Sequence, residues 1–344
     1  MKLPQFYHGD RKKILEGLGK NALLNILERL LLIRQFETRA EAAYLQGKIG
    51  GFFHSYIGQE AIQTAAVEVL GRDNWWTTTY RCHALALLLG ATPNELMAEL
   101  FGRSTGNAKG RGGSMHFYTD RLLGGFGIVG GQIPVATGAA FSLKYLDKKD
   151  QLSICFMGEG AVAQGAFHEA LNLASLWDLP CLYVIENNRW GMGTGVERAL
   201  ANEKIAEEKA PSYKMKGYTV DGMDFVDCYA AFSAFKKEIV ETGRPLLVEM
   251  VTERFKGHSI SDPGLYRTKE ELKECIKRDP ILKFQTDLEE MGILNQESYK
   301  AMEKKIKEQV MEAIQFAEES PWPSVDTLEQ EVFAPEEEGI VWGK

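Results

Sequence analysis

Residues 152–188 determine the expected fold class, and they read LSICFMGEGAVAQGAFHEALNLASLWDLPCLYVIENN. Residues 152–157 and 181–185 are short apolar runs without charged side chains, which is typical of strands that are buried on both faces. Residues 161–176 lie between them and have the length of a helix. The segment therefore predicts a βαβ unit, whose long crossover makes both strands run in the same direction.

Two polar side chains follow these strands. Glu159 comes after the first strand and Asn188 after the second, 188 − 159 = 29 residues further on. The carboxyl ends of parallel strands meet at one edge of a sheet, and carboxylate and amide oxygens suit Mg²⁺. A helix expected after Gly160 would point its N–H groups at the same place, which favours a diphosphate. A plain strand–helix turn is the alternative.

The rest of the chain continues this alternation. We expect helices at 21–46, 58–70 and 226–240, a strand at 245–251, a loop at 254–267 and charged helices at 268–319. The pattern predicts an α/β protein with a mostly parallel sheet, helices on both faces, and helical N- and C-terminal extensions. We expect an N-terminal helical segment at 1–47, an α/β domain at 48–268, and a C-terminal extension at 269–344 that packs on the same domain.

Residues 102–131 hold ten of the chain's 34 glycines, together with Met115, His116, Phe117 and Phe126. A flexible linker would be rich in serine and poor in aromatic residues. This composition favours an ordered loop whose backbone approaches a ligand, and a merely structural irregular loop is the alternative.

Composition excludes several classes of protein. The net charge is 40 − 48 = −8, and the basic residues are scattered, so we expect no nucleic-acid partner. No apolar run approaches 18 residues, and the first 20 residues do not form a signal peptide, so we expect no membrane segment. The five cysteines form no CxxC pair, which favours a reducing, bacterial-type cytoplasm over a disulfide framework or a structural zinc site.

The residues at the strand ends resemble a known motif. Gly158-Glu159-Gly160, then 26 residues, then Asn187-Asn188 is similar to the thiamine diphosphate motif. Further segments resemble the alpha subunits of thiamine-diphosphate-dependent 2-oxo acid dehydrogenases, over about residues 20–320, and the last two resemble the pyruvate dehydrogenase branch. These segments are 51–61 (GFFHSYIGQEA), 80–83 (YRCH), 109–116 (KGRGGSMH), 127–130 (GIVG), 186–194 (ENNRWGMGT) and 256–264 (KGHSISDPG).

This resemblance implies a thiamine-diphosphate-binding fold and a set of cofactor ligands. Glu159, Asn188 and the backbone carbonyl of Trp190 would bind Mg²⁺. Tyr80 and Arg81 would contact the diphosphate, for which the guanidinium fork is suited. A surface salt bridge is the alternative for Arg81.

The resemblance also assigns backbone contacts and two catalytic histidines. Gly160 and Ala161 would hold the diphosphate near the metal, and Gly127 and Val129 would contact the aminopyrimidine through backbone atoms. His258 would bind the cofactor and line the mouth of the active site on a mobile loop. His54 would lie near the substrate, and a structural core histidine is the alternative there.

The implied activity is the oxidative decarboxylation of a 2-oxo acid, followed by reductive acylation of a lipoyl group. The acyl acceptor would be the lipoyl-bearing dihydrolipoyl acetyltransferase core. In this family the glutamate that activates the cofactor belongs to a separate beta chain, so we expect an alpha2-beta2 heterotetramer and no activity from this chain alone.

Some positions depart from the pyruvate branch. That branch usually has aspartate where this chain has Glu159, as in branched-chain relatives, and often a polar residue where this chain has Ala163. Acetoin or a branched-chain 2-oxo acid is therefore the alternative substrate. Ser259 matches a serine that is phosphorylated in animal members, and we expect no kinase to act on it here.

Two other functions are alternatives to this one. Residues 125–130 read GFGIVG, with Asp147 about 20 residues further on, as in a dinucleotide fingerprint. That fingerprint follows a strand, and residues 122–124 are too short to form one, so we expect no NAD binding. A non-enzymatic scaffold with docking helices is the other alternative, but it explains neither the glycine-rich loop nor the acid–amide pair.

Overall fold

The computed structural model describes residues 7–202 and 204–330, and its centre is a six-stranded sheet in which all neighbouring strands are parallel. The strand order is β2-β1-β3-β4-β8-β7. The bounds are β1 Trp75–Thr79, β2 Leu122–Phe126, β3 Ser153–Gly158, β4 Cys181–Asn187, β7 Lys216–Asp221 and β8 Leu246–Val251. A separate antiparallel pair joins β5 (Trp190–Gly191) to β6 (Thr194–Gly195).

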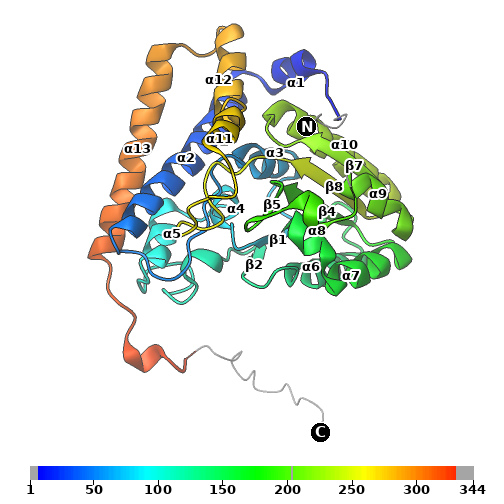
Figure 1. Ribbon diagram of the computed structural model, residues 1–344, viewed down its shortest axis with the longest axis horizontal. Coiled ribbons are helices and arrows are strands. Elements are labelled where there is room, and N and C mark those ends of the chain that lie inside the picture. Colours follow the sequence, from blue (N-terminus) through cyan, green and yellow to red (C-terminus); the bar gives the residue numbers. More distant parts are fainter. Residues whose placement is uncertain (1–6, 203, 331–344) are drawn as a thin grey trace.

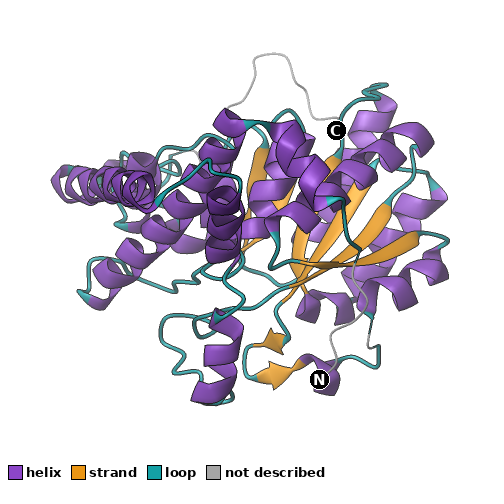
Figure 2. Cartoon of the chain, turned by 90° about the horizontal axis from the view of Figure 1, so that it is seen from above, coloured by secondary structure: helices purple, strands orange, loops and turns teal. Residues whose placement is uncertain are grey.

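Helices cover both faces of this sheet, as predicted (Figures 1 and 2). Alternate residues of β3 enter different cores: Ile154 and Phe156 pack in the main core, and Cys155 and Met157 in the second. The helices are α1 Arg11–Leu18, α2 Lys20–Leu45, α3 Glu60–Leu70, α4 His83–Leu88, α5 Pro93–Leu100, α6 Gln132–Tyr145, α7 Gly165–Leu176, α8 Val196–Ala199, α9 Ile205–Lys209, α10 Phe225–Thr242, α11 Lys269–Ile276, α12 Pro280–Glu290 and α13 Gln296–Glu319.

The two cores draw on different helices. The main core takes apolar side chains from α2, α3, α10 and α13, whereas the second takes them from α6, α7 and α9. Figure 1 shows α2 and α13 side by side. The division of the chain at residues 47 and 268 stays a prediction. Among the described residues, no helix combines the length and the apolar character that a membrane crossing needs.

The predicted βαβ unit is present as β3, α7 and β4, but its helix begins later than expected. Residues Glu159–Ala163 form a 3-10 helix, η2, and α7 begins only at Gly165. Gln164 between them has an extended backbone, with φ −76° and ψ 141°, which interrupts the helix. The prediction of a helix directly after Gly160 was therefore wrong by four residues.

Sequence reasoning also missed three strands of the six-stranded sheet. The prediction that residues 122–124 are too short for a strand was wrong, because β2 continues through Gly124 and Gly125 to Phe126. Glycine is required at 125, since a Cβ there would lie 2.7 Å from the Cys82 sulfur. The other two, β1 and β7, were missed because WWTTT and KGYTVD are not continuous apolar runs.

The glycine-rich segment is ordered by a single buried carboxylate from α5. Glu99 Oε2 accepts the backbone N–H groups of Ala108 and Gly110, both at 2.8 Å. Its Oε1 accepts those of Gly112 at 2.7 Å and Gly113 at 3.2 Å. Four N–H donors on one carboxylate hold the loop in place without regular secondary structure.

We expect Glu99→Gln to destabilise the protein by about 3 kcal/mol, because an amide NH₂ would replace one acceptor and face two N–H donors. Chemical denaturation of the two proteins measures the difference. Glu308→Gln, on the exposed face of α13, is the control and should change stability by less than about 0.5 kcal/mol. Equal stabilities for Glu99→Gln and the parent chain would contradict the assigned role.

Candidate functional site

The strand order places a switch point between β1 and β3, because the chain turns from β1 towards β2 on one side and from β3 towards β4 on the other. Ligands of open parallel sheets bind beyond the carboxyl ends of the strands at such a point. A cavity of about 670 Å³ opens there. It brings together all the predicted site residues: His54, Tyr80, Arg81, Gly127, Val129, Glu159, Gly160, Ala161, Asn188, Trp190 and His258. The individual roles of these residues stay predictions.

Glu159 is the buried carboxylate of this cavity. It lies on η2 directly after β3, and its Oε2 is buried without a hydrogen-bond partner. Burial raises the pKa of the carboxyl, and the backbone N–H groups of Glu159 and Asn188 oppose that rise. A buried carboxylate oxygen without a donor is a position that a cation fits.

Asn188 and Trp190 carry neutral oxygens and line the cavity together with Glu159. Asn188 follows β4, and its Oδ1 accepts the N–H of Trp190 at 3.3 Å. The backbone at Arg189 and Met192 is left-handed, with φ 68° and φ 54°, and the two residues bracket the strand that carries Trp190. In the described ranges, no group of three or more His, Cys, Asp or Glu side chains could hold a metal ion. A hard cation that prefers oxygen ligands and water fits this donor set better than zinc does.

Two buried arginines supply positive charge to the cavity. Arg81 donates to the carbonyls of Ser55 at 2.7 Å and of His258 at 2.6 Å, so the surface salt-bridge alternative was wrong. Arg254 is 1% exposed and donates to the Trp190 carbonyl at 3.3 Å and to the hydroxyl of Tyr266. Sequence reasoning missed Arg254, although its position just beyond β8 was the signal for it.

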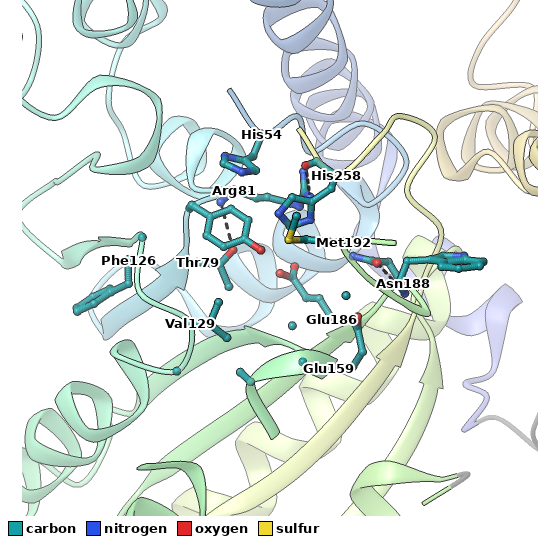
Figure 3. A pocket seen from close by; sticks show the side chains of 18 of the residues that line it. His54, Thr79, Arg81, Phe126, Val129, Glu159, Glu186, Asn188, Met192 and His258 are labelled. Carbon is teal, nitrogen blue, oxygen red and sulfur yellow. Dashed lines mark hydrogen bonds between the residues drawn. The ribbon is translucent and has the colours of Figure 1, made fainter. Parts of the chain in front are cut away.

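His54 and His258 lie at one side of the cavity, opposite Glu159 in the view of Figure 3, and the Tyr80 ring contacts both imidazoles. The His54 ring centroid lies 4.3 Å from that of Tyr80 and 5.2 Å from that of His258. Burial, with Arg81 and His258, lowers the pKa of His54 to about 3. Burial, with Arg81 and Arg254, lowers the pKa of His258 to about 4. Both imidazoles are therefore neutral at pH 7.

Glu186 is a second buried carboxylate that sequence reasoning missed, although it precedes Asn187 at the carboxyl end of β4. Its Oε1 accepts the hydroxyl of Tyr56 and, at 3.3 Å, the amide of Gln63. Burial raises the pKa of Glu186 to about 7, opposed by Tyr56 and Arg81. The side chain lies between His258 and Glu159 in Figure 3.

The fold and the cavity define a class: an α/β protein that binds a ligand at the switch point of a parallel sheet, beside a buried acid, an amide and two arginines. The profile of the family "Dehydrogenase E1 component" matches residues 28–326. The chain belongs to this family, whose members depend on thiamine diphosphate.

Named relatives resemble almost the whole chain. The "Pyruvate dehydrogenase E1 component subunit alpha" of Rickettsia bellii is 40% identical over 316 residues, which cover 91% of this chain and 96% of the relative. The mitochondrial protein of the same description from Schizosaccharomyces pombe is 40% identical over 317 residues, covering 92% and 76%. The "Probable pyruvate dehydrogenase E1 component subunit alpha, mitochondrial" of Caenorhabditis elegans is 42% identical over 303 residues, which cover 87% of this chain and 75% of the relative.

Glu186 predicts a pH dependence of stability. Its pKa is about 7 in the folded chain against an ordinary value of 4.5, so the folded state binds more protons between these values. The stability that this group contributes is complete below pH 4.5 and is lost as the pH rises through 7. We expect the unfolding free energy of the parent chain to fall relative to Glu186→Gln by on the order of 3 kcal/mol between pH 4.5 and 8.

Denaturant titrations of both proteins across this pH range test the prediction. Glu169→Gln, on the exposed face of α7, is the control and should keep a constant difference from the parent chain. A difference between the parent chain and Glu186→Gln that does not change with pH would show that Glu186 is ionised throughout.

Proposed function

We propose that this chain is the alpha subunit of a pyruvate dehydrogenase E1 component. It binds thiamine diphosphate with Mg²⁺ and takes part in the oxidative decarboxylation of pyruvate. The product acyl group passes to the lipoyl group of a dihydrolipoyl acetyltransferase core. The observation that carries the proposal is the unpartnered, buried Oε2 of Glu159 in the cavity at the switch point, which Asn188 and Trp190 also line.

The residues present fit the cofactor. Glu159, Asn188 Oδ1 and the Trp190 carbonyl would hold Mg²⁺, and the positive charge of Arg81, with the hydroxyl of Tyr80, would attract the diphosphate. Gly160 and Ala161 line the wall beside the metal position. When bound, thiamine diphosphate supplies an electron sink for decarboxylation.

Other residues of the cavity would contact the aminopyrimidine end of the cofactor and the substrate. Gly127 and Val129 line the wall on the side of β2 and would offer backbone atoms to the aminopyrimidine. The neutral imidazoles of His54 and His258 can each accept or donate a hydrogen bond without adding charge. We assign them to orienting the 2-oxo acid and, with the loop around His258, to keeping water from the reacting atoms.

The proton donor that activates the cofactor would come from a beta subunit, in an alpha2-beta2 heterotetramer with this chain. All five cysteines are free thiols, and the cytoplasm is the proposed location because it keeps thiols reduced.

Calorimetric titration tests cofactor binding. Thiamine diphosphate with Mg²⁺ should bind the chain together with its beta subunit, and more weakly the chain alone. Glu159→Gln should weaken the metal-dependent binding by at least tenfold. Mutating a residue that only hydrogen-bonds to a metal ligand already lowers metal affinity by about 10- to 100-fold, and Glu159 is itself an assigned ligand. Glu169→Gln serves again as the control and should bind as the parent does. Binding to Glu159→Gln at the parent's affinity would remove the assigned metal site.

Activity measurements test the partner and the substrate. We expect no decarboxylation by the purified chain and full activity after the beta subunit is added, with pyruvate preferred over 3-methyl-2-oxobutanoate and acetoin in kcat/KM. Turnover by the chain alone at the rate of the complex would contradict the requirement for a partner. A preference for the branched substrate would fit Glu159, where pyruvate enzymes usually have aspartate.

A further inference from the structure

A glutamine on a different element contacts the amide of Asn188. Gln59 Oε1 accepts a hydrogen bond from Asn188 Nδ2 at 3.1 Å, although the residues are 129 positions apart. Both side chains are buried and line the cavity. We propose that Gln59 is a positioning residue, which holds the Asn188 amide with its oxygen turned towards the metal position. This inference rests on the proposed function, because it concerns Mg²⁺ at that site.

The two ends of the Asn188 amide are distinguished by their partners. The backbone N–H of Trp190 can only donate, and it donates to Oδ1 at 3.3 Å. The Nδ2 group then needs an acceptor in a buried place, and Gln59 supplies it. An amide oxygen has two lone pairs, so Oδ1 can accept from Trp190 and still bind a cation. Without Gln59, the buried NH₂ would have no partner and the amide would turn to find one.

The helix itself does not explain the glutamine. Gln59 occupies the N-cap position of α3, where Ser, Thr, Asp or Asn is preferred, and its side chain makes no capping bond. The next residue, Glu60, does not bond to the cap either: its Oε2 accepts the N–H of Gly58, which precedes the helix, at 3.0 Å. The Gln59 amide is therefore available for Asn188.

The turn that carries Gln59 is held rigidly from several sides. Glu37 accepts the N–H of Tyr56 at 3.0 Å. Glu60 pairs with Arg34, which also pairs with Asp279 at 2.8 Å. Gly58 has φ 103°, and a Cβ there would lie 2.3 Å from the Glu253 carbonyl oxygen. A residue in so constrained a turn can orient its neighbour.

The inference is tested by measuring the Mn²⁺ affinity of the complex between this chain and its beta subunit. The probe is Mn²⁺ together with thiamine diphosphate. Electron paramagnetic resonance separates free from bound Mn²⁺. Gln59→Leu keeps the bulk but removes the acceptor, and we expect 10- to 100-fold weaker Mn²⁺ binding. Gln59→Glu keeps an acceptor for Asn188 Nδ2. We expect its Mn²⁺ affinity to fall by no more than about threefold from that of the parent.

Gln63→Leu is the matched control, because Gln63 is a buried glutamine one turn further along α3 that donates to Glu186 and Thr78 instead. It should change Mn²⁺ affinity by less than about threefold. In an Asn188→Asp background the NH₂ group is absent, so Gln59→Leu should have almost no further effect. Thermal melting and circular dichroism confirm that each variant is folded.

The outcomes separate the two proposals. If the parent complex binds no Mn²⁺ with thiamine diphosphate, the proposed function and the role of Gln59 both fall. If the parent binds and Gln59→Leu binds equally well, only the role of Gln59 falls. Loss of affinity in Gln63→Leu or Gln59→Glu as large as in Gln59→Leu would also overturn it, because packing of α3 would then explain the effect.

Discussion

The common direction of six strands is the constraint on which the rest of the structure depends. Because every neighbouring pair is parallel, the carboxyl ends of β1, β3 and β4 share one edge, and the residues that follow each strand are brought to one place. Tyr80, Glu159 and Asn188 come from three separate strand ends and line one cavity. A single antiparallel strand in the centre would send its polar residue to the opposite edge, so the site depends on the topology before it depends on any side-chain contact.

This arrangement requires loops that are ordered but not regular. Glycine lets the backbone of residues 102–131 approach its neighbours closely, yet glycine also raises the entropy of the unfolded chain. Glu99 offsets this entropic cost, because its one buried carboxylate accepts four backbone N–H groups of the loop. Met115, at the end of a short 3-10 helix (Gly113–Met115), and Gly127, directly after β2, then line the cavity.

The sequence predicted the parts that depend on local pattern, and it failed where distant contacts decide. The βαβ unit was readable because buried parallel strands are continuous apolar runs. β1 and β7 were not, because WWTTT and KGYTVD are not continuous apolar runs, although Trp, Thr, Tyr and Val are common in strands. In the fold, β1 pairs with β3 and β7 pairs with β8. Glu159 and Asn188 were predicted from their places at the strand ends, and the other predicted residues of the site came from the resemblance. Glu186 and Arg254 were missed because their importance comes from partners such as Tyr56 and Trp190, which lie far away in the sequence.

Contacts with the surrounding fold also hold two residues beside the cavity in unfavourable backbone conformations. Arg189 and Met192 adopt left-handed backbone conformations, each of which costs about 1 kcal/mol or more for a residue with a side chain. Contacts from three directions hold them there. Asn187 Oδ1 accepts the Arg189 N–H at 2.9 Å, Arg254 holds the Trp190 carbonyl, and the Trp190 ring lies 4.8 Å from that of Tyr266. The Asn187 contact is a local turn within two residues, whereas Arg254 and Tyr266 come from far along the chain, so local turn chemistry and the surrounding framework together hold this hairpin. The bend that results places Trp190 in the lining of the cavity, together with Glu159 and Asn188.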